Sequence, residues 1–281
     1  MSRKKKKGII WSVVLGVLLL FAGWVAWTNL HITVTHYEIQ NPKIPAEFDG
    51  YKIALVSDLH NRDWGETLLK PLKEEAPDII VITGDITDSA HADFDTVMEF
   101  LEEALKIAPV YYVTGNHEAW MDDFSLLADR MEQAGVTMLD DRWVLLQRGE
   151  VKIRLSGVQD PDFVERDRSI QEAVVAKKLE PLVEPEFYNI VLCHRPERFS
   201  AYVSAGADLV FTGHAHGGQF RLPFIGGLYA PDQGFFPKYT KGIYHEGSTD
   251  MVVSRGLGDS VLPLRFNNSP ELVLVTLEKT A

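Results

Sequence analysis

Cysteine is almost absent from this chain of 281 residues, which contains only Cys193. An intramolecular disulfide is therefore excluded, and so is a structural zinc site built from several thiolates. Cys193 ends an apolar run and directly precedes His194. We expect it to be a buried structural residue, because free cysteine packs as a small apolar side chain.

Positive charge is scarce beyond the first seven residues. Five of the 28 basic residues, Arg3 and Lys4–Lys7, precede residue 8, which leaves 23 against 40 acidic residues and a formal charge of −17. A nucleic-acid-binding domain needs a basic surface, so no nucleic acid is expected as a partner. The acidic excess favours solubility.

Long apolar runs are also lacking, with one exception near the N-terminus. Gly8–Thr28 carries no charge over 21 residues, and as a helix it would measure ~31 Å, the thickness of the hydrocarbon core of a bilayer. Trp11, Trp24 and Trp27 stand near its ends, as in an interfacial aromatic belt. The preceding basic cluster predicts a cytoplasmic N-terminus and an extracytoplasmic location for everything after residue 30.

A cleaved signal peptide is the alternative interpretation of this segment. The apolar part of a signal peptide is shorter, ~7–15 residues, and ends in small residues. Here the segment ends in the bulky sequence Trp24-Val25-Ala26-Trp27, which favours an uncleaved single-pass anchor. We therefore expect a cytoplasmic basic tail and transmembrane anchor in residues 1–30, and one domain in residues 31–281 outside the cell membrane.

Strands and helices alternate after residue 31. The expected strands are Ile32–Ile39, Tyr51–Ser57, Asp78–Thr83 and Pro109–Thr114, and the expected helices are Glu66–Glu75, Phe94–Lys106 and Asp122–Ala134. This rhythm predicts a parallel sheet. The later segments predict a meander of short strands, a helix and a last strand, at Val136–Leu139, Trp143–Gln147 and Val151–Gly157, at Arg166–Lys178 and at Glu271–Leu277. The fold class is thus α/β, one domain with two sheets and outer helices.

Side chains that commonly bind metals follow five apolar runs. The runs are typical of buried strands and lie at Ile53–Val56, Ile79–Ile82, Val110–Val113, Ile190–Cys193 and Leu209–Phe211. The clusters after them contain, in order, Asp58 and His60, then Asp85, then Asn116 with His117 and Glu118, then His194, then His214 and His216. Active sites of open α/β sheets form at the carboxyl ends of strands, so these loops are expected to share one rim.

The residue types in these clusters suit a pair of metal ions. Asp58 and His60 are two positions apart, which directs both side chains to the same side at a strand end, and His214 and His216 share this spacing. Asp85 follows Gly84 at an expected sharp turn, where a carboxylate can bridge two ions. Imidazole and oxygen ligands without thiolate suit Mn, Fe, Zn or Ni, and not Ca.

Each cluster also has an ordinary structural explanation when taken alone. A histidine after a strand is commonly a hydrogen-bonded core residue, Asp85 fits a turn or a helix cap, and Asn116 fits a left-handed turn position. The occurrence of all five clusters in one order, each after an expected strand, favours metal binding. The histidines outside the clusters receive the structural interpretation: His31, His36, His91 and His245.

In these five blocks the sequence resembles the calcineurin-like metallophosphoesterase family. The family pattern of D-x-H, G-D, G-N-H-[DE], H and G-H-x-H is present in order from Asp58 to His216. Further segments are similar to its bacterial membrane-associated branch, sometimes called the YkuE/YaeI type: Gly213–Gln219, Gly227–Tyr229, Ser254–Gly258 and Arg265–Glu271. The resemblance covers about residues 31–278.

The resemblance implies a fold and a metal pair. The fold is two β-sheets packed face to face with helices outside, an α/β/β/α arrangement. One divalent transition-metal ion, with Mn or Zn favoured, would be held by Asp58, His60, Asp85 and His216, and the second by Asp85, Asn116, His194 and His214. Asp85 then bridges the ions, and His117 faces the substrate without binding metal.

The implied activity is hydrolysis of phosphate esters. Two ions ~3.5–4 Å apart share and acidify a water, and the resulting bridging hydroxide attacks phosphorus in line while the metals neutralise the phosphoryl oxygens. His117 would protonate the leaving oxygen or stabilise it as an imidazolium. Glu118 is assigned a structural role, and Asp88 a supporting contact to a ligand loop.

Other functions fit the same residues. One is a pyrophosphohydrolase of a lipid-linked nucleotide sugar of the UDP-2,3-diacylglucosamine type, because the resemblance extends to such enzymes. Another is a catalytically silent, metal-stabilised module that binds the cell wall, which the intact His117 disfavours. The substrate is expected to be a phosphorylated small molecule or a lipid-linked one. Arg62 and Arg195 are the favoured phosphate contacts, ahead of Arg255 and Arg265, and Gln219–Lys238 forms either a lipid-facing or substrate-covering lip or a packed loop.

The basic cluster and the apolar segment generate a prediction about topology. The full-length protein should stay with membranes through a high-salt wash, because its attachment is apolar and not electrostatic. Protease added to intact spheroplasts should digest the domain. Protection until lysis would show the reverse orientation, and release with a new N-terminus near residue 30 would show a cleaved signal peptide. A chain deleted for residues 1–30 should be soluble and active, because no candidate ligand precedes Asp58.

Overall fold

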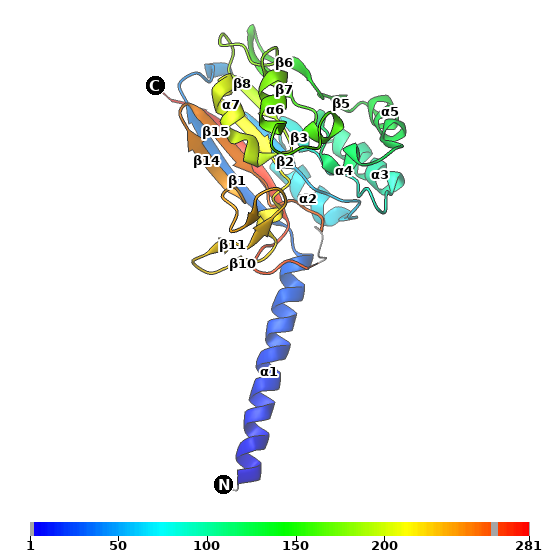
Figure 1. Ribbon diagram of the computed structural model, residues 1–281, viewed down its shortest axis with the longest axis vertical. Helices are drawn as coiled ribbons and strands as arrows, with labels where there is room; N and C mark the ends of the chain where they lie inside the picture. The colour runs from blue at the N-terminus through cyan, green and yellow to red at the C-terminus, as the bar shows by residue number, and fades with distance from the viewer. Residues whose placement is uncertain (1–2, 260–263, 281) are drawn as a thin grey trace.

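The computed structural model of the protein describes residues 3–259 and 264–280. Two six-stranded sheets pack face to face, and helices cover their outer faces (Figure 1). This arrangement confirms the α/β class with two sheets and outer helices. The segments 1–30 and 31–281 expected from the sequence include residues 1–2, 260–263 and 281, which lie outside the described residues.

The first sheet has the strand order β1-β16-β2-β3-β4-β5. Its strands are β1 (Thr33–Asn41), β2 (Lys52–Val56), β3 (Ile79–Thr83), β4 (Val110–Val113), β5 (Thr137–Met138) and β16 (Glu271–Lys279). β2 to β5 are parallel, as the alternation of strands and helices predicts. β16 lies parallel to β1 and antiparallel to β2. Every residue of β3 is buried, which explains its continuous apolar sequence.

Three amphipathic helices pack on the outer face of the first sheet: α2 (Glu66–Glu75), α3 (Phe94–Leu105) and α5 (Phe124–Ala134). Asp93 caps α3, because its side chain accepts a hydrogen bond from the N–H of Thr96. α5 ends at Gly135, whose φ of 109° is left-handed and suits glycine. Leu101 of α3 and Leu127 of α5 are fully buried in this layer.

The second sheet has the strand order β14-β15-β9-β8-β7-β6. Its strands are β6 (Arg142–Arg148), β7 (Val151–Gly157), β8 (Asn189–Leu192), β9 (Leu209–Thr212), β14 (Gly242–Glu246) and β15 (Thr249–Val253). β7, β8, β9 and β15 run parallel. The helices α6 (Gln171–Leu179) and α7 (Phe199–Ala205) pack against its outer face through residues such as Val175 and Tyr202.

A core of apolar side chains fills the space between the two sheets. Leu55 and Val81 project into it from the first sheet, and Leu155, Ile190 and Phe211 project into it from the second. All five are fully buried. Because side chains alternate along a strand, the neighbouring residues point outward to the helices. Each of these strands is therefore buried on both faces, and the ends of both sheets are held in register by one core.

Two local predictions from the sequence differ from the structure. The expected meander from Val136 to Gly157 is divided, because β5 extends the first sheet beside β4 while β6 and β7 form an antiparallel hairpin in the second. The helix expected at Arg166–Lys178 begins only at Gln171. The Asp167 side chain accepts a hydrogen bond from the N–H of Ser169, which holds the preceding residues in a turn.

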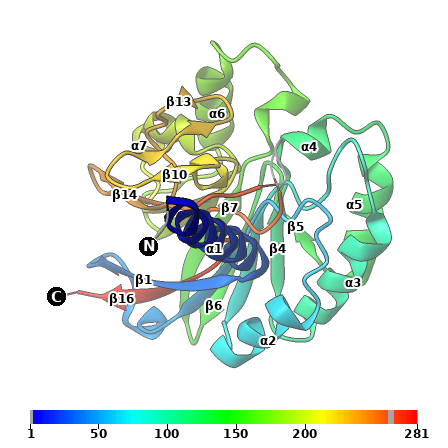
Figure 2. The ribbon, with the colours of Figure 1, turned by 90° about the horizontal axis from the view of Figure 1, so that it is seen from below.

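The helix α1 (Arg3–Leu30) is continuous and projects from the domain (Figure 1). Its segment Ile9–Leu30 is long and apolar enough to cross a membrane. Two reciprocal hydrogen bonds fix its end to the domain: the Nδ2 of Asn29 donates to the carbonyl of Arg265 at 2.8 Å, and its Oδ1 accepts from the N–H of Arg265 at 2.7 Å. Figure 2 shows the same helix nearly end-on, against one end of the domain.

Short elements complete the fold. They are the helix α4 (Asn116–Ala119), the 3-10 helices η1 (Ala46–Phe48), η2 (Pro161–Phe163), η3 (Pro196–Arg198) and η4 (His216–Gly218), and the two-residue strands β10 (Arg221–Leu222), β11 (Gly226–Gly227), β12 (Tyr229–Ala230) and β13 (Gly234–Phe235). β10 pairs with β11, and β12 pairs with β13. Both ribbon views place β10 beside the end of α1 (Figures 1 and 2).

The core between the sheets generates a prediction about stability. Phe211→Ala should lower the free energy of unfolding by ~3–5 kcal/mol, because it leaves a cavity where a fully buried ring packs. Leu126→Ala is the control, since that side chain is exposed and its loss should cost less than ~0.5 kcal/mol. Chemical unfolding of the full-length protein in detergent, followed by tryptophan fluorescence, measures both. Equal effects of the two substitutions would contradict the packing described here.

Candidate metal centre

The five polar clusters all follow strands, as the sequence predicts. Those after β2, β3 and β4 come from neighbouring parallel strands of the first sheet, and those after β8 and β9 come from neighbouring parallel strands of the second. Because the two sheets share one core, their carboxyl ends meet at one rim of the domain. The clusters contain the candidate ligands Asp58, His60, Asp85, Asn116, His194, His214 and His216.

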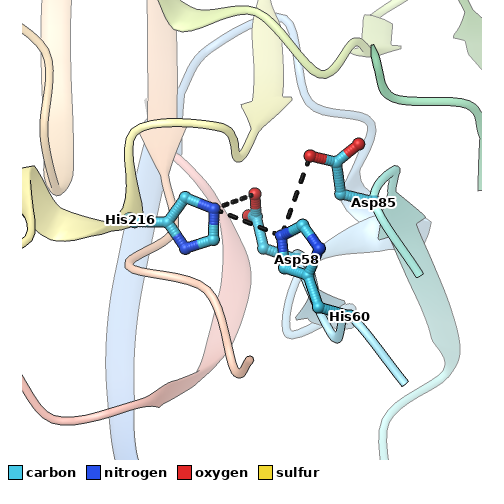
Figure 3. A group of neighbouring side chains, drawn as sticks. All are labelled: Asp58, His60, Asp85 and His216. Atoms are coloured by element: carbon cyan, nitrogen blue, oxygen red, sulfur yellow. Dashed lines mark hydrogen bonds and ion pairs between the residues drawn. The ribbon is translucent and has the colours of Figure 1, made fainter. Parts of the chain in front are cut away.

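One group of candidate ligands consists of Asp58, His60, Asp85 and His216 (Figure 3). One ligand atom from each lies within 4.8 Å of the others. The Nε2 of His216 is 3.3 Å from the Oδ1 of Asp58 and 3.3 Å from the Nε2 of His60. In Figure 3 the two imidazoles and the two carboxylates point toward a common centre.

A second group consists of Asp85, His194 and His214. The Nε2 of His194 is 3.1 Å from the Oδ2 of Asp85 and 3.1 Å from the Nδ1 of His214. Asp85 thus belongs to both groups. Its Oδ2 also lies 3.8 Å from the Nε2 of His60, so a single carboxylate oxygen stands between the two sets of imidazoles.

Asn116 adds a neutral oxygen to the same rim. It begins α4, directly after β4, and its side chain is buried. Its Oδ1 has no hydrogen-bond partner among the residues that the structure describes. An unpaired buried carbonyl oxygen is costly, and coordination of a cation satisfies it.

The backbone at the site is held in an uncommon conformation. Five of the seven candidate ligands have positive φ values between 44° and 64°, a left-handed region that residues with a Cβ seldom adopt. They are Asp58, His60, Asp85, His214 and His216. Such strain persists where the surrounding structure enforces it, and it concentrates at functional sites.

Burial controls the charge of the imidazoles. It lowers the pKa of His60 to about 4 and that of His214 to about 3, and it lowers the pKa of His216 well below the usual value. These rings are therefore neutral at physiological pH, which is the form that binds metals. His194 differs: burial opposes its protonation, but the adjacent Asp85 carboxylate raises its pKa to about 10. A bound cation would take over the charge that this proton supplies.

Burial also acts on the carboxylates. It raises the pKa of Asp58 to about 6, although His194 and the hydroxyl of Ser57 oppose this effect. For Asp85 burial is overcome by His194, which holds the pKa of this carboxyl well below its usual range. Two carboxylates buried this deeply need positive charge beside them, and divalent cations supply it.

Hydrogen bonds orient the ligands from outside. The Nδ1 of His194 lies 2.7 Å from the carbonyl oxygen of Thr83, which can only accept, so His194 turns its Nε2 toward Asp85. The Nε2 of His214 lies 3.1 Å from a carboxylate oxygen of Asp232, which leaves its Nδ1 facing the site. Partners of this kind fix the tautomer and the ring orientation of metal-binding histidines.

Glu118 has the structural role that the sequence analysis assigns to it. Its Oε2 accepts hydrogen bonds from the N–H groups of Asp85 at 2.9 Å and Gly115 at 2.6 Å, and its Oε1 accepts from the N–H of Thr87 at 3.3 Å. Its burial and the nearby Asp85 charge raise its pKa to about 8. The loops pack so closely that a Cβ on Gly84 would lie 2.4 Å from the backbone nitrogen of Gly115.

His117 lies beside the two groups. The N–H of Ser89 donates to its Nδ1 at 3.1 Å, so the proton of the neutral ring is on Nε2. Its ring centroid is 4.5 Å from that of His60, and its side chain is partly exposed. Asp88, expected as a supporting residue, has a carboxylate oxygen 3.8 Å from the same Nδ1.

Arg195 is not available as a phosphate contact. It is fully buried, its Nε donates to Asp160 at 2.7 Å, and it also pairs with Asp232. Neither of these aspartates was predicted from the sequence as part of the site. Asp160 could have been predicted, because it follows β7, another parallel strand of the second sheet, as the candidate ligands follow theirs. Asp232 lies in an irregular loop, where no periodicity marks it.

The other arginines also have partners. Arg62 donates to Asp259 at 2.9 Å and to the carbonyl of Asn29 at 2.8 Å. Arg255 pairs with Glu271 at 3.0 Å. Arg265 is buried, and its guanidinium lies 3.4 Å from the Nδ1 of His216, which places it next to a candidate ligand.

Comparison with known proteins agrees with this geometry. The family described as calcineurin-like phosphoesterase matches residues 51–218, a range that contains all seven candidate ligands. The metallophosphoesterase YkuE of Bacillus subtilis is 30% identical over 297 residues, which cover 100% of this chain and 99% of YkuE. The phosphodiesterase YaeI of Escherichia coli is 26% identical, over 81% of this chain and 82% of YaeI.

A transmembrane protein with a metallophosphoesterase domain from Danio rerio is 26% identical, over 88% of this chain and 57% of that protein. The family match covers more than half of the chain, and the match to YkuE extends over nearly the whole of both proteins. On this evidence the chain belongs to the calcineurin-like phosphoesterase family.

Proposed function

We propose that this protein is a membrane-anchored phosphoesterase that hydrolyses phosphate esters at a two-metal centre. The observation that carries the proposal is the position of Asp85, whose carboxylate belongs to both groups of candidate ligands. A shared carboxylate between two clusters of imidazoles is the arrangement that a dinuclear site needs. The family is dimetal-dependent and its members are phosphoesterases, which supports the same function.

In this proposal the first ion would be held by Asp58, His60, Asp85 and His216, and the second by Asp85, Asn116, His194 and His214. The residues fit such ions in three respects: the imidazoles His60, His214 and His216 are neutral, the Oδ1 of Asn116 is unpartnered within the described residues, and the ligand atoms are nitrogen and oxygen. This set suits Mn or Zn, and also Fe or Ni.

The metals and the protein have separate tasks in the proposed reaction. When bound, the two ions would lower the pKa of a shared water, the nucleophile, and neutralise charge on the phosphoryl oxygens. The chain orients the ligands through Thr83, Asp232 and Glu118. His117 presents a protonated Nε2, because the N–H of Ser89 occupies its Nδ1. It would donate a hydrogen bond or a proton to the leaving oxygen.

The proposal includes residues 1–30 as a single-pass anchor and residues 31–281 as an extracytoplasmic phosphoesterase domain. It is supported by the exposed apolar helix, by the basic residues before it and by the similarity to a relative named as a transmembrane protein. The substrate would be a phosphorylated small molecule or a lipid-linked one. Turnover of bis-p-nitrophenyl phosphate by the full-length protein with added manganese tests the proposed activity, and its absence would favour a silent binding module.

Asp85→Asn tests the shared ligand. The substitution removes the only negative charge common to both groups, so the variant should lose most of both metal ions. Elemental analysis of the purified protein measures the loss. Asp95→Asn is the control, because Asp95 is exposed and should not affect metal content. Full occupancy in Asp85→Asn would refute the bridging assignment.

His117→Asn tests the role of the leaving-group donor. The variant should keep both metals and yet turn over ~10²–10⁴-fold more slowly, the usual contribution of acid–base catalysis. The loss should be smaller for p-nitrophenyl esters than for alkyl esters, because p-nitrophenolate needs little protonation to leave. His245→Asn, at an exposed histidine, should behave as the unmodified protein. Equal losses for both classes of ester would argue against the donor role.

A further inference from the structure

Large apolar side chains are exposed on the two small hairpins that follow the metal centre. Phe224 and Ile225 lie in the turn between β10 and β11, and Phe235 and Phe236 lie at and after β13. Phe224 and Phe236 have φ values of 67° and 54°, which are rare for aromatic residues. The backbone is thus strained where it holds these rings in solvent. We call the three phenylalanines together with Ile225 the aromatic tips.

The β10–β11 hairpin is joined to the side of α1 through Phe266. Phe266 packs against Phe21 and Trp24, with ring centroids 5.9 Å and 5.5 Å apart. Phe266 in turn pairs with the residue that precedes β10, and its carbonyl accepts a hydrogen bond from the N–H of Arg221 in β10. β10 therefore lies beside the last turns of α1, at the end of the helix that meets the domain (Figure 1).

The length of the apolar helix determines how much of α1 a membrane must cover. The apolar segment runs from Ile9 to Leu30. If the membrane ended before Phe21, the remaining apolar part, from Ile9 to Leu20, would measure only ~18 Å, far less than the ~30 Å of a bilayer's hydrocarbon core. A spanning α1 therefore carries Phe21 and Trp24 into the membrane, where the ring of Phe266 meets them, and it places the β10–β11 hairpin at the membrane boundary beside the end of the helix.

The charges of the segment agree with this placement. Between Gln219 and Lys241 the basic residues are Arg221, Lys238 and Lys241, and the acidic residue is Asp232. Asp232 is paired with His214 and Arg195, whereas Lys238 and Lys241 are exposed. Lysines beside exposed aromatic rings are typical of surfaces that bind lipid headgroups, and they stand out in a domain of net negative charge.

We propose that the aromatic tips form a second membrane-binding surface. They insert at the boundary between the headgroups and the acyl chains of the same bilayer that holds α1. This inference rests on the anchor of the proposed function. The second surface fixes the orientation of the metal centre, because His216 begins η4, which lies a few residues before β10, and its carbonyl accepts a hydrogen bond from the Nδ2 of Asn268 at 2.7 Å. The metal centre then opens near the height of the headgroups, and its substrate class is a phosphoester or pyrophosphate carried by a lipid.

Site-specific fluorescence tests the surface in the full-length protein. Phe224→Cys, Leu18→Cys and Leu126→Cys are labelled one at a time with a polarity-sensitive dye and reconstituted into vesicles of phosphatidylcholine and phosphatidylglycerol that contain lipid-bound quenchers. Cys193 is buried, and the unmodified chain reports any labelling there. Leu18 lies in α1, and Leu126 is an exposed apolar control on α5, away from α1.

Quenching at positions 18 and 224, but not at 126, is the expected result. Quenching at 18 alone would overturn the second surface while leaving the anchor intact. Iodide quenching at 224 would then place the tip in water, and protection from iodide would place it against protein. Lack of quenching at 18 would refute the anchor, and the inference would fall with it.

An activity measurement separates the surface from the chemistry. Phe224→Asp combined with Ile225→Asp should lower hydrolysis of an acyl-chain nitrophenyl phosphodiester in vesicles by ~10-fold or more, because two apolar side chains no longer enter the membrane. Hydrolysis of soluble bis-p-nitrophenyl phosphate should be unchanged. Equal losses on both substrates would contradict the inference. If the unmodified protein hydrolysed neither substrate, the proposed function would be refuted. The fluorescence measurement would still show whether the aromatic tips bind the membrane.

Discussion

The buried carboxyl group of Glu118 holds together the loops on which the candidate metal centre depends. It accepts hydrogen bonds from backbone N–H groups of Asp85, Thr87 and Gly115, and so it joins the ends of two neighbouring strands, β3 and β4. The N–H of His117, which follows β4 as Gly115 does, donates to the Oδ1 of Asp85 at 2.9 Å. The remaining oxygen of Asp85 is thereby directed at His60 and His194. The position of the shared carboxylate follows from backbone hydrogen bonds, before any metal contributes.

The rim of the site could be predicted because its strands are buried on both faces. Such strands are short, continuous apolar runs, and β2, β3, β4, β8 and β9 all have this form, so the polar residues that end them are conspicuous in the sequence. The pairing of the strands supplies the rest, since neighbouring parallel strands end at the same edge. The helix at Glu66–Glu75 was equally predictable from its periodicity.

Features that depend on contacts between distant residues were not predictable in this way. The apolar sequence of β16 shows a strand but not its place between β1 and β2. Arg195 follows a candidate ligand and was interpreted as a phosphate contact, yet three aspartates from other loops, Asp160, Asp162 and Asp232, pair with it in the interior. A buried guanidinium needs such partners, and a single sequence does not show which carboxylates will reach it. The expected meander is divided between two sheets for the same reason. β5 pairs with β4 and β6 pairs with β7, and the composition of these segments does not show which pairs form.

The attachment of α1 to the domain also has a mechanical consequence. The helix ends at Leu30 and β1 begins at Thr33, so a force transmitted through α1 acts along β1. β1 lies at the edge of its sheet, parallel to β16, and the nine residues from Thr33 to Asn41 pair in register with Glu271 to Lys279. Such a force loads the whole ladder of hydrogen bonds in shear instead of opening them one by one. β1 and β16 thus act as a clamp. A pull on α1 would be resisted by this strand pair, the longest among the described residues, before it could distort the loops of the candidate metal centre.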